Sequence, residues 1–118
     1  MLQPIVRALL SQLFHRKGVP VESQQWWLMW ASFPDLNWAR LRVFADGKAD
    51  VFDMDGRTMT FRSETEARDH LLEDEFTRYD RLGPEDEEEL GRPVTSIKPP
   101  SAANDWRLVA RMYVKGGK

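Results

Sequence analysis

The stretch RLRVFADGKADVFDMDGRTMTFR, residues 40–62, carries two Asp-Gly pairs between runs of valine, phenylalanine and threonine. An Asp-Gly pair flanked by residues that favour strands is the strongest short-range signal of a β-hairpin. Asp46-Gly47 and Asp55-Gly56 therefore predict two consecutive hairpins. Two hairpins that share their middle strand form a three-stranded antiparallel meander.

The lengths of the two turns set which residues of the meander face each other. If each loop has two residues, Val43 pairs with Asp50, Leu41 with Phe52, and Phe52 with Met59. Because side chains alternate across a strand, this register places an apolar set on one face of the sheet. The members of that set are Leu41, Val43, Phe52, Met59 and Phe61.

A tryptophan-rich segment precedes the meander, from Gln25 to Trp30. In an extended chain Trp26 and Trp30 point to one face and Trp27 to the other. Aromatic residues favour strands, and both faces are apolar here. We expect a strand covered on both sides, which extends the sheet to three or four strands and ends in a loop around Pro34.

A helix is predicted after the meander. Ser63-Glu64-Thr65-Glu66 has the form of a capping box, in which the Ser63 hydroxyl and the Glu66 carboxylate satisfy free amides at a helix start. The helix should run to about Phe76. Its expected inner side is apolar and consists of Leu71, Leu72, Phe76 and Tyr79. Its expected outer side is acidic and consists of Glu66, Asp69 and Glu73.

Three further elements complete the predicted fold. Residues 2–14 show the apolar stripe of an amphipathic helix, and Gly83-Pro84 opens a short helical turn that ends at Leu90. Residues 104–115 fit a helix and a strand equally well, and we favour the helix because Asn104 can cap it. The prediction is one α+β domain over 1–118, an antiparallel sheet packed with an N-terminal helix, a central acidic helix and a C-terminal helix or strand.

The charge of the chain is distributed unevenly. The whole chain carries a net charge of −2 at pH 7. Between Glu64 and Glu89, twelve acidic residues stand against three arginines, a net charge of −9, so the rest of the chain carries +7. One contiguous segment therefore supplies a negative field on an otherwise basic molecule. We expect this segment to avoid direct contact with nucleic acid.

The sequence offers little for catalysis or for binding a metal. It has no cysteine, and its two histidines, His15 and His70, lack a partner at metal-ligand spacing. Asp53 begins a pattern similar to a calcium loop, but Arg57 occupies a ligand position and Thr58 stands where the sharp turn needs glycine. We therefore expect no catalytic residue, no metal and no cofactor, and predict that the protein is not an enzyme.

The apolar segments are too short for a membrane protein. Crossing a bilayer takes about 20 apolar residues, and the longest uninterrupted run is 26–31. Pro4 and Arg7 interrupt the start of the first apolar stretch, which argues against an export signal. The absence of cysteine favours a reducing compartment. We expect a soluble, cytoplasmic protein that does not contact the membrane.

The five tryptophans have two interpretations. The structural interpretation makes Trp26, Trp30, Trp38 and Trp106 part of the core. The functional interpretation places one or two tryptophans on the surface as anchors for a partner, because tryptophan is enriched at binding hot spots. Trp27, on the less consistent face of its strand, is the best candidate for such an anchor.

The acidic run also has two interpretations. It is either a solvated surface that keeps the protein in solution or a docking surface for a basic partner, since clustered carboxylates attract a cationic surface and mimic phosphates. A nuclease active site is the obvious cationic target. With Trp27, the candidate partner-binding residues are Glu66, Asp69, Glu73, Asp74, Glu75, Glu85, Asp86, Glu87, Glu88 and Glu89.

The chain resembles the immunity proteins that accompany bacterial polymorphic toxins, in particular those of contact-dependent growth inhibition systems. The resemblance is carried by Trp30 to Leu36, by the two Asp-Gly hairpins, by Glu66 to Phe76 and by the acidic run to Leu90. It covers about half of the chain and is one of general type, without a diagnostic motif. It implies a cytosolic antitoxin that blocks its cognate toxin, often a nuclease, without doing chemistry.

The sequence thus predicts a toxin-neutralising immunity protein whose acidic helix and the loop after it meet a basic patch on the toxin. The alternative from another class is a scaffold or regulatory binding module unrelated to toxins. An enzyme with a site built from carboxylates ranks third.

Overall fold

The structure is a computed structural model that describes residues 18–30 and 35–115. In these ranges six strands form one sheet in the order β4-β3-β2-β1-β5, with β6 paired to β2. The strands are β1 (Val21–Met29), β2 (Leu36–Phe44), β3 (Ala49–Phe52), β4 (Thr58–Phe61), β5 (Thr77–Arg78) and β6 (Tyr113–Val114). The helices are α2 (Glu64–Glu73), α3 (Pro84–Leu90) and α4 (Asp105–Leu108), and the short 3-10 turns are η1 (Tyr79–Arg81), η2 (Val94–Ser96) and η3 (Val109–Arg111).

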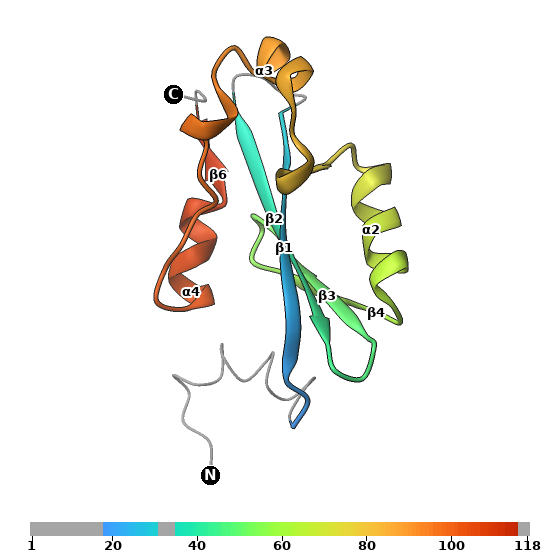
Figure 1. Ribbon diagram of the computed structural model, residues 1–118. Helices are drawn as coiled ribbons and strands as arrows, with labels where there is room; N and C mark the ends of the chain where they lie inside the picture. The colour runs from blue at the N-terminus through green and yellow to red at the C-terminus, as the bar shows by residue number, and fades with distance from the viewer. Residues whose placement is uncertain (1–17, 31–34, 116–118) are drawn as a thin grey trace.

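Helices cover both faces of this antiparallel sheet, so the α+β class is confirmed. α2 packs on one face, and α3 and α4 lie on the other side (Figure 1). The core under α2 contains Trp27, Ala39, Leu41, Val43, Ala49, Val51, Ala67 and Leu71. The core on the opposite face contains Leu28, Trp30, Leu36, Trp38, Phe52, Leu90, Ile97, Leu108 and Met112. The predicted N-terminal helix at 2–14 lies outside the described residues.

The tryptophan-rich segment forms β1 and alternates as predicted. Leu28 and Trp30 enter one core and Trp27 the other, and all three are buried. Strand β1 pairs with β2 along nearly its whole length, from Val21 opposite Phe44 to Met29 opposite Asn37. A strand buried on both faces needs apolar residues at consecutive positions, which explains the density of tryptophan here.

The two hairpins form where the sequence predicts them, but the predicted register is wrong by one residue. Val43 lies opposite Ala49 instead of Asp50, Leu41 opposite Val51 instead of Phe52, and Met59 opposite Val51. Each loop has three residues, because Phe44 N–H bonds to Lys48 O and Asp53 N–H to Arg57 O, with Gly47 and Gly56 at positive φ. A slip of one residue moves a side chain to the other face. Phe52 therefore belongs to the face opposite α2, and Val51 takes its place.

Helix α2 starts at the predicted cap. The Ser63 hydroxyl accepts a hydrogen bond from Glu66 N–H at 3.1 Å. In a capping box the Glu66 carboxylate would accept from the backbone N–H of Ser63. Here it accepts instead from the N–H of the preceding residue, Arg62, at 3.0 Å. The helix ends at Glu73, three residues before the predicted Phe76. Its buried residues are Ala67 and Leu71, and Leu72, predicted to face inward, is 57% exposed.

The C-terminal segment is both helix and strand. The Asn104 side chain caps α4 by accepting from Arg107 N–H at 2.9 Å, as predicted. The chain then passes through η3 and pairs with β2 as β6, with Val114 opposite Leu36. Trp106, expected in the core, lies on α4 with 73% of its surface exposed. The four-residue helix turns Leu108 to the core instead.

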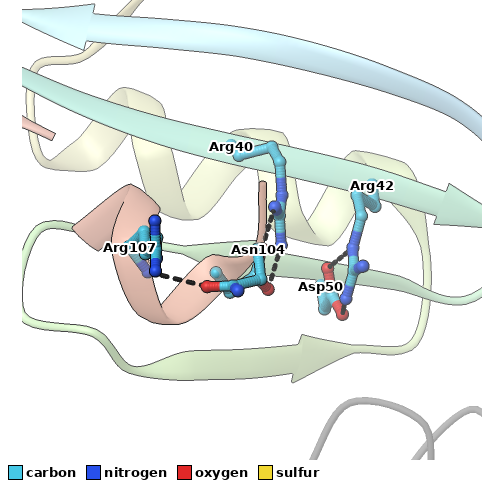
Figure 2. Close-up of polar contacts among 6 residues, drawn as sticks. Arg40, Arg42, Asp50, Asn104 and Arg107 are labelled. Carbon is cyan, nitrogen blue, oxygen red and sulfur yellow. Dashed lines mark hydrogen bonds and ion pairs between the residues drawn. The ribbon is translucent and has the colours of Figure 1, made fainter. Parts of the chain in front are cut away.

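Two ion pairs join β2 to its surroundings on the face opposite α2. Arg40 and Arg42 project from β2 on the same side, and the guanidinium of Arg42 meets the carboxylate of Asp50 (Figure 2). Arg40 bonds in the same two-point manner to Asp105, the first residue of α4. These pairs tie β2 to β3 and to α4, and both Arg40 and Asp50 are buried. In the part of the chain that the structure describes, no helix is long and apolar enough to cross a membrane.

Candidate functional site

The acidic segment divides into residues that hold the fold and residues that do not. Glu66 belongs to the first group, because its carboxylate accepts hydrogen bonds from both the backbone and the guanidinium of Arg62. These bonds favour the charged form and hold the pKa of Glu66 below its ordinary value. Asp74 lies 3.7 Å from the His70 ring, one turn earlier in α2.

Three of the five acids in the run from Glu85 to Glu89 are also structural. Asp86 accepts from Gly83 N–H at 2.8 Å and closes the start of α3. Glu87 accepts from Val94 N–H at 2.7 Å, which holds the chain after α3 against the helix. Glu89 accepts from the indole N–H of Trp30 and so anchors α3 to the end of β1. Three candidate binding residues thus have an internal role in the fold.

Five acids remain without an internal partner. Within residues 18–30 and 35–115 they make no hydrogen bond or ion pair, and all five are exposed. We call them the unpaired acids: Asp69, Glu73, Glu75, Glu85 and Glu88. They lie on α2, on the turn after it and on α3. Their charges are not neutralised from within, so they are available to a partner.

Glu75 occupies a backbone conformation that disfavours it. Its φ is +66°, the left-handed region, and it is the one described residue other than glycine with a positive φ. It sits just after α2, where Glu75 N–H bonds to Leu72 O and Phe76 N–H bonds to Leu71 O. This is the Schellman arrangement, and glycine is the usual residue at the left-handed position. A glutamate there costs about 1 kcal/mol of backbone strain.

The charges at the end of α2 also oppose the helix dipole. The C-terminus of a helix carries partial negative charge, and acidic residues there are each unfavourable by about 0.3–1 kcal/mol. Glu73, Asp74 and Glu75 follow one another at this end. A local arrangement that is costly for the fold in two ways is typical of a functional surface. A cation bound at this end would relieve the electrostatic part of the cost.

Trp27 does not belong to the surface. Only 3% of it is exposed, and its indole N–H donates to Gln25 Oε1 at 3.0 Å within the core under α2. The proposed role of Trp27 as a surface anchor is therefore wrong, because the Trp27 side chain lies on the face of β1 that α2 covers. The exposed tryptophan is Trp106, which belongs to α4. Helix α4 lies on the side of the sheet opposite α2 (Figure 1).

A cleft opens beside the acidic end of α2, and sequence reasoning did not find it. It has a volume of about 460 Å³ and lies between α2, the sheet and the turn at 53–57. Asn37, Arg57 and His70 line it, from three segments far apart in the chain. The sequence had drawn attention to His70 as a histidine without a metal partner and to Arg57 as the residue that breaks a calcium-loop pattern, but not to Asn37. A signal for Asn37 would have been a polar residue at an inward position of a buried strand.

The described residues contain no group of three or more histidine, aspartate or glutamate side chains placed to hold a metal ion. Comparisons of the chain with protein-family models, curated proteins and solved structures found no match. We therefore infer the function from the residues of this chain.

Proposed function

We propose that this protein is an immunity protein that binds a cognate toxin domain, a nuclease in the simplest case, and neutralises it by covering its basic active site. The unpaired acids form the contact surface. The observation that carries this proposal is the end of α2, where Glu73 and Glu75 stand exposed and unpaired at a helix terminus that repels them. A cation that approaches this end relieves the electrostatic part of their cost to the fold.

The chemistry of the surface suits a nuclease. Active sites that bind nucleic acid present arginine and lysine to phosphates, and carboxylates on a rigid scaffold take the place of those phosphates. The unpaired acids contribute five negative charges, and the partnered acids around them keep the local field negative. Such a field speeds the encounter with a basic protein and repels nucleic acid. Specificity for one toxin would come from the shape around the acids.

The decisive test is protection of cells. The chain is co-expressed with a candidate toxin domain from a neighbouring gene, and the growth of these cells is compared with that of cells that express the toxin domain alone. We expect the wild-type chain to restore growth and the Glu73→Lys/Glu88→Lys variant to protect poorly. Growth arrest in the presence of the folded wild-type chain would refute the proposal.

Binding kinetics separate a docking surface from a merely solvated one. Reversing Glu85 and Glu88 to lysine should slow association with the toxin by about tenfold at low salt, with a weaker salt dependence than the wild type. Glu22→Lys is the matched control for the single Glu88→Lys variant, because Glu22 is also exposed but lies on β1, outside the acidic segment. If Glu88→Lys and Glu22→Lys associate with the toxin at the same rate, the acidic surface is not part of the interface.

The competing function is a scaffold or regulatory module that binds an unrelated partner. In that case a pull-down from the source cells would recover a partner that is not toxic when expressed alone. The toxin co-expression assay would show no protection.

A further inference from the structure

Trp106 is the most exposed large apolar side chain that the structure describes, with 73% of its surface accessible. It lies on α4, and its indole N–H has no hydrogen-bond partner among the described residues. Tryptophan is enriched at protein interfaces, because it buries a large area when it enters a contact and has few rotatable bonds. The exposure of Trp106 therefore indicates a surface that another protein covers.

Positively charged side chains follow Trp106 in the chain. Arg107, Arg111 and Lys115 are exposed and stand four residues apart along α4, η3 and the end of β6. In the part of the chain that the structure describes, the side chains of Arg107 and Lys115 have no hydrogen bond or ion pair, and Arg111 donates from Nη1 to Ser101 O. We call this surface the cationic face: Trp106, Arg107, Arg111 and Lys115.

The same chain carries a complementary surface on the same side of the sheet. Both α3 and α4 lie on the side opposite α2 (Figure 1), and Leu90 of α3 enters the same core as Leu108 of α4. Glu85 and Glu88 lie one turn apart on α3, and both belong to the unpaired acids. Because each copy of the chain presents both charges on this side, two copies can satisfy each other.

The positions of α3 and α4 on the sheet suit a symmetric contact. The hydrogen bond from Trp30 to Glu89 holds α3 at the end of the sheet where β1 ends and β2 begins. The ion pair between Arg40 and Asp105 holds α4 near the middle of β2. A two-fold axis between the two helices brings α3 of one copy onto α4 of the other and repeats the contact once. Such a contact closes as a dimer and does not continue into a fibre.

We propose that two copies of this chain form a two-fold dimer in which the cationic face of each copy covers Glu85 and Glu88 of the other, with Arg107 paired to Glu88 and Trp106 buried in the contact. A nucleic acid suits this face less well, because a strand bound along α4 would be repelled by the acids of α3 on the same side. The second copy leaves the unpaired acids of α2 free, since α2 lies on the opposite side of the sheet. The inference is therefore independent of the proposed function.

Sedimentation equilibrium of the full chain at a series of protein concentrations measures the dimer. We expect an equilibrium between monomer and dimer that shifts toward monomer as salt is added, because the contact is charged. Glu88→Lys and Arg107→Glu should each weaken the dimer on the order of a hundredfold, since like charges then meet in both halves of the contact. Glu22→Lys, on β1, is the matched control and should dimerise as the wild type does.

A mixture of Glu88→Lys with Arg107→Glu tests the assigned ion pair. In the mixed dimer the introduced lysine meets the introduced glutamate in one half of the contact, and the other half keeps the original pair. The mixture should therefore dimerise nearly as well as the wild type, although each variant alone does not. A mixture that stays monomeric would overturn the proposal, and so would a wild-type chain that is monomeric at every concentration.

Tryptophan fluorescence reports the burial of Trp106. The emission of the wild type should move to shorter wavelength as the dimer forms, and Trp106→Phe should not show this shift, because Trp27, Trp30 and Trp38 are already buried in the monomer. A single-stranded oligonucleotide is the competing probe. An emission change that requires the oligonucleotide and does not depend on protein concentration would assign the cationic face to nucleic acid and overturn the dimer.

These outcomes are separate from those for toxin neutralisation. A chain that dimerises but does not protect cells from the toxin retains the dimer and loses the proposed function. A chain that protects cells but remains monomeric retains the proposed function and loses the dimer.

Discussion

Arg40 and Asp105, 65 residues apart in the chain, form a two-point ion pair in which Nη1 lies 2.7 Å from Oδ1 and Nη2 lies 3.0 Å from Oδ2. Arg40 is 6% exposed, and its guanidinium also lies 5.0 Å from the centre of the Phe52 ring. Asp105 opens α4, so this pair holds the start of the C-terminal helix against the sheet.

Removal of one partner of this pair should be costly. We expect Asp105→Ala to lower the free energy of unfolding by about 3 kcal/mol, because it leaves the Arg40 charge buried without a counter-ion. The double variant Arg40→Met/Asp105→Leu should lose much less, since it leaves no unpaired charge. Urea unfolding measures the stability of both variants, and a double variant that loses as much stability as Asp105→Ala would contradict this account.

Glu75 should trade stability against binding. We expect Glu75→Gly to raise the free energy of unfolding by about 1 kcal/mol, because glycine adopts the positive φ without strain. Glu75→Gln removes the charge but keeps the strain, so it should stabilise less. If the proposed function holds, both variants should bind the cognate toxin more weakly than the wild type.

Chemical unfolding and toxin-binding kinetics on these two Glu75 variants separate the backbone from the charge. A glycine variant no more stable than the glutamine variant would show that the left-handed residue is not strained.

The carboxylate of Glu66 should make stability depend on acid pH. Its pKa is held below the ordinary value of 4.5, first by the backbone N–H of Arg62 and then by the Arg62 side chain. A lowered folded-state pKa contributes stability that is complete above the unfolded value and is lost as the pH falls through the folded value. The stability difference between wild type and Glu66→Gln should therefore be largest near neutral pH and shrink below about pH 4.5. A stability difference between wild type and Glu66→Gln that stays constant from pH 7 to pH 3 would contradict this prediction.

Tyr113 should ionise at a higher pH than an ordinary tyrosine. Its hydroxyl donates a hydrogen bond to Asp35, and the loss of that bond on ionisation raises the pKa of Tyr113 above 10.0. The contact contributes stability that is present below the ordinary pKa and lost as the pH rises through the raised one. ¹³C NMR of labelled tyrosine follows Tyr113 separately from Tyr79. Asp35→Asn should move the Tyr113 titration to lower pH, and an unchanged midpoint would argue against the contact.

Local features of the chain could be predicted from its sequence. The two Asp-Gly turns, the Ser63 and Asn104 caps and the alternation of β1 each depend on residues within a few positions of one another. The register of the hairpins could not be predicted, because two-residue and three-residue loops both suit an Asp-Gly pair. That single difference moved Phe52 to the other face of the sheet.

The acidic segment shows the same division. Its charge is visible in the composition, and a net charge of −9 between Glu64 and Glu89 predicts a negative surface. Whether a given acid faces a partner or holds the fold depends on distant groups. Glu89 is bound by Trp30, 59 residues earlier, and Glu87 by the backbone of Val94.

Turns, helix caps and the alternation of a strand depend on residues close together in the sequence, and the charge of a segment depends only on its composition. Both can therefore be predicted from the sequence. The unpaired acids, the burial of Trp27 and the cleft around Asn37 arise where segments far apart in sequence meet. Hydrogen bonds and burial are settled by three-dimensional distance. Only the packing of the helices on the sheet therefore determined which polar groups have an internal partner and which do not.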